Sequence, residues 1–291
     1  MSRSTVLFGC LYIVATPIGN RKDITLRAIE TLRAVDLIAT EDTRHSKGLL
    51  QYHGISTTLL SLHAHNEATR TVLICKKLKQ GYDIALISDA GTPLISDPGY
   101  RLISAVRKAG IRVIPIPGAC AGIVALVASG LSTERFVFEG FIPSHGEIRR
   151  KKLESLKTES RTLIFYESVY RIQNLISLLN EIFGPERMAT IARELTKKFE
   201  TIYTSSLLEL KKWLNKNLEQ QKGEFVILVE GRHLEKTKEI NEEHSRLLTV
   251  LLQELSFKKA VALATKISGI SRKRLYPLAL TIQQQHQHSS L

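Results

Sequence analysis

Short apolar runs alternate with amphipathic stretches along the first 130 residues of the chain. Runs of four or five mainly apolar residues are typical of buried strands and occur at 11–15, 36–39, 84–87 and 113–116. Apolar residues recur at the spacing of a helix face in the intervening segments, which predicts helices at 24–32, 69–78, 100–109 and 121–128. Strands that alternate with helices predict an α/β domain built around a mainly parallel sheet.

The pattern changes near Arg135, where aromatic and apolar residues begin to alternate. Strands are predicted at 136–141, 162–166, 188–192 and 225–229, and a helix is predicted at 171–182. This arrangement predicts a second α/β domain with a more hairpin-like sheet. The two predicted domains are residues 1–130 and 131–234.

The last 60 residues have a different character. Residues 235–243 are charged and poor in apolar side chains, so they are interpreted as a linker. Amphipathic segments beyond it predict a small helical module over 245–282, with a turn at 268–271. The tail at 283–291 is rich in Gln and His and is expected to be disordered.

Composition favours a polyanionic partner. Lys and Arg total 41 against 28 Asp and Glu, for a formal net charge of +13, which attracts nucleic acids or phosphates. The cysteines, Cys10, Cys75 and Cys120, lie far apart and form no CxxC pair, so neither a disulfide framework nor a metal site is expected. No apolar run reaches the ~18 residues of a spanning helix, and a cytoplasmic protein is expected.

Three loops follow predicted strands and are rich in Gly, Pro and small residues, at 16–20, 88–99 and 115–122. They should meet at the carboxyl edge of the sheet, where α/β folds bind ligands. GxGxxG and GxxxxGK[ST] are both missing, which argues against a standard dinucleotide or NTP site. The loop at 88–99 combines carboxylates, hydroxyls and exposed backbone, a mixture that suits S-adenosylmethionine (SAM). Plain turns and tight helix–sheet packing are the structural alternatives.

Long strings of the chain resemble the tetrapyrrole methylase superfamily, the class III SAM-dependent methyltransferases. The matching strings are LYIVATPIGNRKDITLRAIETL, DLIATEDTRHSKGLL, ALISDAGTPLISDPGY, IPIPGACAGIVALVASGL, FEGFIP, RTLIFYES and ARELTKKFE, and SFKKAVALATKISGISRKRLYPLAL resembles a C-terminal extension. The resemblance implies two α/β domains with SAM in the cleft between them, and a homodimer. It is closest to a branch that 2′-O-methylates a cytidine in the decoding region of 16S rRNA in the small ribosomal subunit.

The resemblance also implies which residues contact the cofactor. Carried over by position, these are Pro17, Ala90, Gly91, Thr92, Ile95, Cys120, Ala121, Tyr166 and Leu195. Many members of the superfamily carry Gly-Gly-Asp where this chain has Ala90-Gly91-Thr92. Asp89 or Asp97 is therefore expected to supply a carboxylate near the cofactor.

Methyl transfer to a ribose hydroxyl requires in-line alignment and removal of a proton. Glu41, Glu167 and Glu194 are candidate bases, and Lys197 is a candidate cation beside them. For residues 41–44 the structural alternative is a helix N-terminus capped by Asp42 or Thr43. For residues 193–198, where Arg193 is a further candidate phosphate contact, the alternative is a solvated charged turn.

Basic residues that could hold RNA phosphates occur in several clusters. The candidates are Arg44, Arg149, Arg150, Lys198, Lys258, Lys259, Arg272, Lys273 and Arg274. The segment 257–276 is similar to a helix-turn-helix module, and solvated faces are the alternative. Two other functions stay open: a tetrapyrrole (precorrin-type) methyltransferase, which the basic charge argues against, and a non-enzymatic RNA-binding factor.

Overall fold

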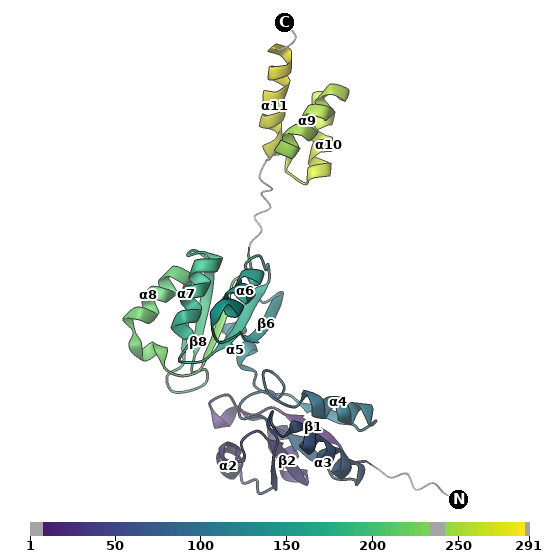
Figure 1. Cartoon of the computed structure of the whole chain (residues 1–291), viewed down its shortest axis with the longest axis vertical. Coiled ribbons are helices and arrows are strands. Elements are labelled where there is room, and N and C mark those ends of the chain that lie inside the picture. Colours follow the sequence, from purple (N-terminus) through teal and green to yellow (C-terminus); the bar gives the residue numbers. More distant parts are fainter. Residues whose placement is uncertain (1–7, 233–241, 289–291) are drawn as a thin grey trace, which may run out of the picture. The chain divides into compact units, whose positions relative to one another are not determined.

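A computed structural model describes residues 8–232 and 242–288 of the chain (Figure 1). Contacts divide the chain into two compact units, residues 1–232 and 233–291, which are described separately. The first unit contains both predicted α/β parts, so the boundary at residues 130–131 stays a prediction. Among the helices of the described ranges, none combines the length and apolarity needed to cross a membrane.

The first sheet is entirely parallel, with strand order β3-β2-β4-β1-β5. Its strands are β1 (Leu11–Val14), β2 (Leu37–Thr40), β3 (Leu59–Ser61), β4 (Ile84–Leu86) and β5 (Val113–Ile116). In β1, Tyr12 pairs with Ala85 of β4 on one side and with Ile114 of β5 on the other. Because all the strands run the same way, the loops that follow them emerge at one edge.

Helices cover both faces of this sheet, as its nearly continuous apolar strands require. They are η1 (Arg21–Asp23), α1 (Leu26–Ala34), α2 (Thr43–Tyr52), α3 (Glu67–Lys79) and α4 (Tyr100–Lys108). One buried cluster joins Ile74 of α3 and Leu102 of α4 to the sheet, and another joins Leu32 of α1 and Leu50 of α2 to the opposite face.

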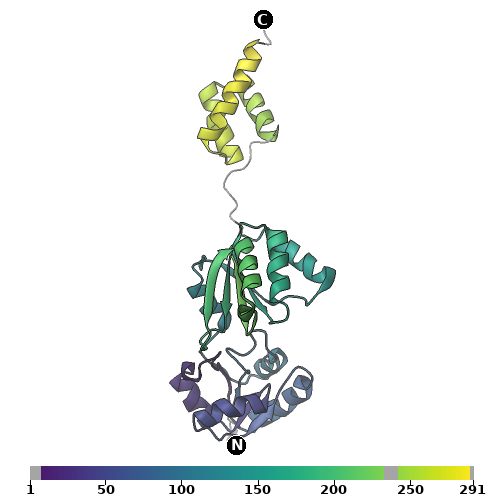
Figure 2. The same ribbon diagram turned by 90° about the vertical axis from the view of Figure 1, so that its left-hand side faces the viewer.

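The second sheet is mixed, with strand order β6-β7-β10-β8-β9. Figure 2 shows the strands and helices of this part in teal and green. Its strands are β6 (Phe136–Phe141), β7 (Thr162–Glu167), β8 (Met188–Arg193), β9 (Thr201–Ser206) and β10 (Phe225–Val229). Only the β6–β7 pair is parallel, which confirms the predicted hairpin-like character. The helices of this part are α6 (Gly146–Leu156), α7 (Ile172–Phe183), α8 (Leu207–Lys216) and η2 (Leu218–Gln221).

One more helix joins the two sheets. Helix α5 (Ala121–Ala128) follows the last strand of the first sheet, but it packs on β7 and β10 of the second. Its Ala125 and Leu126 share a buried cluster with Ile164 of β7. The chain thereby carries the loop at 115–122 directly to the second sheet.

Six elements had no counterpart in the sequence-based prediction: η1, β3, α6, β9, α8 and η2. Helix α2 was foreseen only as the structural alternative for residues 41–44. Strand β3 has three residues, too few for a periodic pattern. Helix α6 is dominated by Glu, Arg and Lys, so its sequence looks like a charged run rather than an amphipathic helix. These elements are stabilised by tertiary packing, because their local sequence alone favours neither a helix nor a strand strongly.

The second unit is a helical module made of α9 (Glu242–Glu254), α10 (Phe257–Ser268) and α11 (Arg272–His288). Gly269 ends α10 in the left-handed conformation, with φ of 70°. The predicted disorder of residues 283–291 stays a prediction, although the Gln-rich segment continues α11 as far as His288. Residues 289–291, and 235–241 of the predicted linker, lie outside the described residues.

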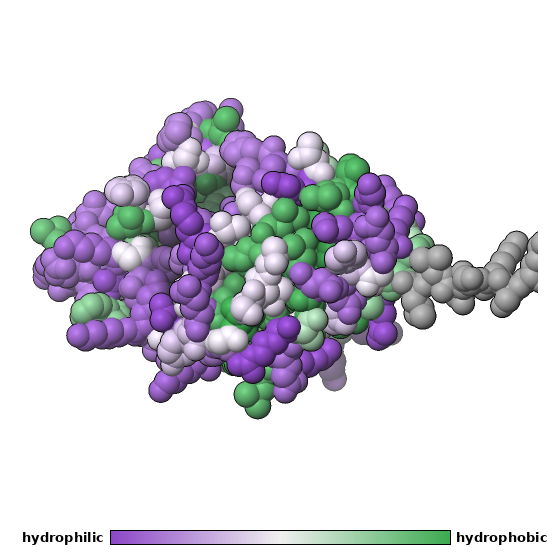
Figure 3. All heavy atoms as spheres, turned by 90° about the horizontal axis from the view of Figure 1, so that it is seen from below, coloured by the Kyte–Doolittle hydropathy of each residue, from purple (hydrophilic) through white to green (hydrophobic). Residues whose placement is uncertain are grey.

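Exposed apolar side chains gather on parts of the surface, and Figure 3 shows one face where they form a patch among hydrophilic residues. Large exposed apolar residues include Ile123 and Val127 of α5. The edge strand β6 adds Phe136, Phe138 and Phe141. An apolar helix beside an unpaired strand edge is unusual on a free surface.

A buried ion network joins α6, β7 and α7. The Arg149 side chain is 1% exposed, and its Nη2 donates to Oε2 of Glu167 at 2.7 Å. Arg171 donates to the other oxygen of Glu167 at 2.8 Å, and the Ser168 N–H donates to the same oxygen. Glu167 therefore pairs with two guanidinium groups inside the second α/β part.

We expect Glu167→Ala to lower the free energy of unfolding by about 3–5 kcal/mol, because it leaves Arg149 charged and buried without its partner. Urea denaturation measures this change. Glu181→Ala is the matched control, since it removes the exposed partner of Arg150 and should move the midpoint little. Equal effects of the two substitutions would contradict this account of the network.

Candidate active site

Backbone hydrogen bonds tie the loops after β1 and β4 together. Thr16 and Gly91 exchange both of their N–H···O bonds, at 2.9 and 3.1 Å. The hydroxyl of Thr92 donates to the carbonyl of Ala119 at 2.9 Å, which adds the loop after β5. Gly91 has φ of 80°, and a Cβ there would come within 3.3 Å of Ile18. The three predicted loops therefore do converge at the carboxyl edge of the first sheet.

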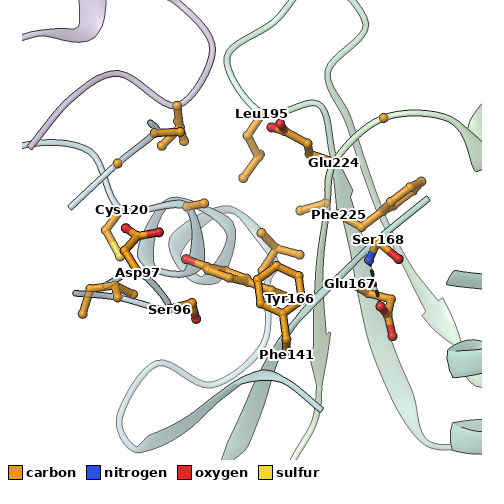
Figure 4. Close-up of a pocket in the computed structure, with 18 of the residues that line it drawn as sticks. Ser96, Asp97, Cys120, Phe141, Tyr166, Glu167, Ser168, Leu195, Glu224 and Phe225 are labelled. Carbon is orange, nitrogen blue, oxygen red and sulfur yellow. Dashed lines mark hydrogen bonds between the residues drawn. The ribbon is translucent and has the colours of Figure 1, made fainter. Parts of the chain in front are cut away.

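A cavity of about 420 Å³ lies where these loops face the second sheet (Figure 4). Its lining is mainly apolar and comes from the three loops and from β7, β8 and β10. The lining residues from the loops include Ile18, Ala90, Gly91, Thr92, Ile95, Ser96, Asp97, Cys120 and Ala121. Those from the second α/β part include Phe141, Tyr166, Ala192, Leu195, Glu224 and Phe225.

Tyr166 forms part of the cavity wall. Its hydroxyl oxygen accepts from the N–H of Gly122 at 3.0 Å, so it joins β7 to the start of α5. The rings of Phe138 and Phe141 pack edge-on against it, with centroids 5.0 and 5.6 Å away. Burial raises the pKa of the Tyr166 phenol to about 12, so the group is neutral near pH 7.

Asp97 is the half-buried carboxyl of this cavity. Burial raises its pKa from 3.8 to about 6, with Glu41 and Asp89 adding to the rise and a hydrogen bond with Ser88 opposing it. The pKa of Glu41 is also raised, by burial and by Asp89, while His63 opposes the rise. The carboxyl edge of the sheet thus holds three carboxyl groups that influence one another.

Most of the cofactor contacts expected from the resemblance do line this cavity. They are Ala90, Gly91, Thr92, Ile95, Cys120, Ala121, Tyr166 and Leu195. Pro17 and Asp89 instead line an adjacent cavity of about 370 Å³. The role of each in binding stays a prediction. Sequence reasoning missed Phe141 and Phe225 as lining residues. The one local sign of this role is that Phe141 ends β6 and Phe225 begins β10.

Glu167, a predicted base, is among the residues that line the cavity, but its carboxylate is held by two arginine side chains, and its catalytic role stays a prediction. Alternate strand residues point to opposite faces, so Tyr166 faces the cavity while Glu167 faces α6 and α7. In Figure 4 the two side chains leave the strand in different directions. Both carboxylate oxygens are occupied by arginine side chains.

Glu194 and Lys197 form a charged turn beside the cavity. Oε1 of Glu194 accepts from Nζ of Lys197 at 2.9 Å and from the N–H of Glu224 at 3.0 Å. Burial raises the pKa of Glu194, but these hydrogen bonds outweigh it and the net shift is downward. Burial lowers the pKa of Lys197, but its hydrogen bonds with Glu224 and Glu194 have the larger effect, and the net shift is upward. Both groups are therefore charged near pH 7.

The predicted RNA contacts have different surroundings. Arg149 is buried in the ion network, where it pairs with Glu167, and its predicted contact with RNA stays a prediction. Arg193 is also buried and donates to carbonyls of its own α/β part. The other candidates are exposed or partly exposed, namely Arg44, Arg150, Lys198, Lys258, Lys259, Arg272, Lys273 and Arg274. Asp42 caps α2, which confirms the structural alternative for residues 41–44.

Comparison with known proteins places the chain in a family. The sequence profile described as tetrapyrrole (corrin/porphyrin) methylases matches residues 10–211, and that of the RsmI C-terminal HTH domain matches residues 238–283. Ribosomal RNA small subunit methyltransferase I of Haemophilus influenzae is 49% identical over 277 residues, covering 95% of this chain and 98% of the relative. The protein of that name from Synechocystis sp. is 44% identical, covering 94% and 99%.

Solved structures share the fold at low identity. Uroporphyrin-III-C-methyltransferase from Thermus thermophilus matches with a TM-score of 0.55 at 20% identity, covering 76% of this chain and 94% of the other. A diphthine synthase matches with a TM-score of 0.61 at 15% identity, covering 77% and 90%. The chain belongs to the tetrapyrrole (corrin/porphyrin) methylase family, together with the relatives named ribosomal RNA small subunit methyltransferase I.

Proposed function

We propose that this protein is a SAM-dependent methyltransferase whose acceptor is the ribose 2′-hydroxyl of a cytidine in the decoding region of 16S rRNA, within the 30S subunit. The observation that carries the proposal is the 49% identity to relatives named for small-subunit rRNA methylation, over 95% of the chain. The porphyrin enzyme of similar fold shares only 20% identity, which favours RNA over a tetrapyrrole as substrate. The formal charge of +13 fits a polyanionic acceptor.

The residues of the 420 Å³ cavity fit SAM. When bound, SAM supplies a methyl group activated by a positively charged sulfonium. Ala90, Gly91 and Ala121 are small, so backbone groups are accessible to an adenosine. The carboxylate of Asp97 would attract the positive charges of the cofactor, and the neutral Tyr166 would keep that wall of the site uncharged.

The chain also offers groups that could accept the hydroxyl proton. Glu194 is a weak acceptor because its pKa is lowered. Glu41 is a stronger proton acceptor, because burial and Asp89 raise its pKa. Glu41 belongs to the same sheet edge, where the N–H of Asp42 donates to Asp89 at 3.1 Å.

The apolar surface of α5 and β6 supports a homodimer. Ile123, Val127 and the three phenylalanines of β6 are exposed, and β6 is an edge strand. A second copy that covers this surface would remove apolar area from water and protect the strand edge. The sheet edge that carries the cavity loops would stay free for RNA.

Filling the cofactor cavity should abolish activity. Gly91→Trp is expected to eliminate detectable SAM binding in calorimetry and transfer of labelled methyl to 30S subunits, because the indole would occupy the cavity. Gly110→Trp is the matched control: Gly110 has φ of 71° with open space around it, so it imposes similar backbone strain away from the site. Wild-type SAM affinity in a folded Gly91→Trp protein would contradict the proposed site.

Asp97 should make SAM affinity depend on pH. Because the ionised carboxylate favours a cation, affinity should rise as the pH passes through about 6, where half of Asp97 is ionised, and should level off at higher pH. Asp97→Asn should remove this dependence in calorimetric titrations, and the exposed Asp23→Asn should keep it.

The stability of the protein gives an independent test of the raised Asp97 pKa. Ionised Asp97 costs stability, so the free energy of unfolding of the wild type should fall relative to Asp97→Asn between pH 3.8 and about 6.

The dimer surface has its own test. Val127→Glu should shift the mass measured by light scattering from two chains to one, because a buried carboxylate at the interface has no partner. Val72→Glu is the matched control, since Val72 of α3 is 71% exposed and Val127 is 70% exposed. An unchanged dimer in Val127→Glu would place the interface elsewhere.

A further inference from the structure

A second cavity, of about 370 Å³, adjoins the cofactor cavity on the side of helix α2. The two cavities share Ile18, Ala90 and Glu224 in their walls. The second one is bounded by the loop after β1, the end of β4, the first turns of α2 and the charged turn at Lys197. Its other lining residues include Thr16, Pro17, Gly19, Arg21, His45, Ser46, Gly48, Leu49, Ser88, Asp89 and Lys197. The proposed cofactor contacts leave most of this space unassigned.

Three basic side chains line the second cavity: Arg21, His45 and Lys197. Lys197 already pairs with Glu194 and Glu224, at 2.9 Å each. Among the described residues, neither Arg21 nor His45 forms a salt bridge, although the carboxylate of Asp42 lies beside His45 and accepts from its backbone N–H at 3.4 Å. The Arg21 guanidinium is held over the ring of Tyr52, 5.4 Å from its centroid, so it is oriented but not neutralised.

Glycine in the middle of α2 keeps this cavity open. Gly48 has ordinary helical geometry, and a Cβ there would meet only Nη2 of Arg21, at 3.8 Å. Glycine is unfavourable inside a helix when the backbone does not require it. At this position the absence of a side chain on Gly48 leaves space beside Arg21 in the cavity.

The cavity also has acceptors at its inner end. Asp89 follows β4, and its Oδ1 accepts from the N–H of Asp42 at 3.1 Å, which fixes the carboxylate. Asp89 and Glu224 can accept hydrogen bonds from ribose hydroxyls or a base amino group. An arginine and a histidine without a salt bridge, carboxylates that can accept hydrogen bonds, and a wall shared with the methyl-donor cavity match the chemistry of a nucleotide.

We propose that the second cavity holds the acceptor nucleotide, with its phosphate on Arg21 and His45 and its ribose toward the wall formed by Ile18 and Ala90. This inference rests on the proposed function, since it assigns the place of the RNA acceptor. The exposed Arg44, whose side chain is 92% exposed, would bind the next phosphates along the strand.

The test fills the second cavity without touching the first. Gly48→Leu is expected to leave the SAM dissociation constant from calorimetry unchanged and to lower single-turnover methylation of 30S subunits by about 100-fold, since a small misplacement of the acceptor has an effect of that size. Gln51→Leu is the matched control, because Gln51 is exposed on the same helix outside the cavity. Circular dichroism and thermal unfolding confirm that both variants fold.

A second variant tests the phosphate contact alone. Arg21→Ala should weaken binding of 30S subunits, measured by filter binding with S-adenosylhomocysteine present, and should reduce the slope of log affinity against log salt by about one. Arg27→Ala removes an exposed arginine of α1 that does not line the cavity and should leave the slope unchanged.

The outcomes separate this inference from the function on which it rests. If wild-type protein labels 30S subunits while Gly48→Leu and Arg21→Ala match it, only the acceptor site is overturned. Loss of SAM affinity in Gly48→Leu would assign the second cavity to the cofactor and also overturn it. If wild-type protein leaves 30S subunits unlabelled, the proposed function falls and this inference with it.

Discussion

The paired backbone hydrogen bonds between Thr16 and Gly91 are the interaction on which the site depends. They join the loops after two neighbouring parallel strands, and Thr92 extends the connection to the loop after β5. Without this pairing, each loop would be a separate flexible turn at the sheet edge. With it, the backbone of three loops forms one wall, in which glycine and alanine leave the main chain accessible.

The opposite wall comes from the second sheet, and two contacts hold it in place. Tyr166 of β7 accepts from Gly122 at the start of α5, while Thr196 accepts from the N–H of Asn20 at 3.0 Å. Helix α5 strengthens this link, because its chain leaves the first sheet and its apolar side packs on the second. The two cavities therefore have walls that cannot separate without breaking these contacts.

Most of the strands and helices were predictable, because buried parallel strands produce apolar runs such as 84–87 that stand out from their surroundings. The three loops were also predictable, since Gly and Pro after a strand carry a local signal. The orientation of Glu167 was available from the period of two along β7, which puts it opposite Tyr166. It was missed because a carboxylate next to a loop suggested catalysis. Arg149 looked like surface charge, since nothing local indicates that α6 buries it against Glu167.

The second cavity could not have been predicted, since it needs Arg21, Gly48 and Lys197 from three segments that only the fold brings together. The charged turn that contains Glu194 and Lys197 forms one wall of this second cavity, which adjoins the cofactor cavity. The basic residues of the sheet edge then have a local role that is independent of the helical module.

The central claim is that adenosyl sulfonium binds where the three loops meet β7. A crystal structure of the protein with SAM tests it most directly. We predict electron density for the cofactor against Gly91, Cys120 and Tyr166, with the carboxylate of Asp97 facing a positively charged group. Density for SAM at any other place on the protein, with this cavity filled only by solvent, would contradict the account.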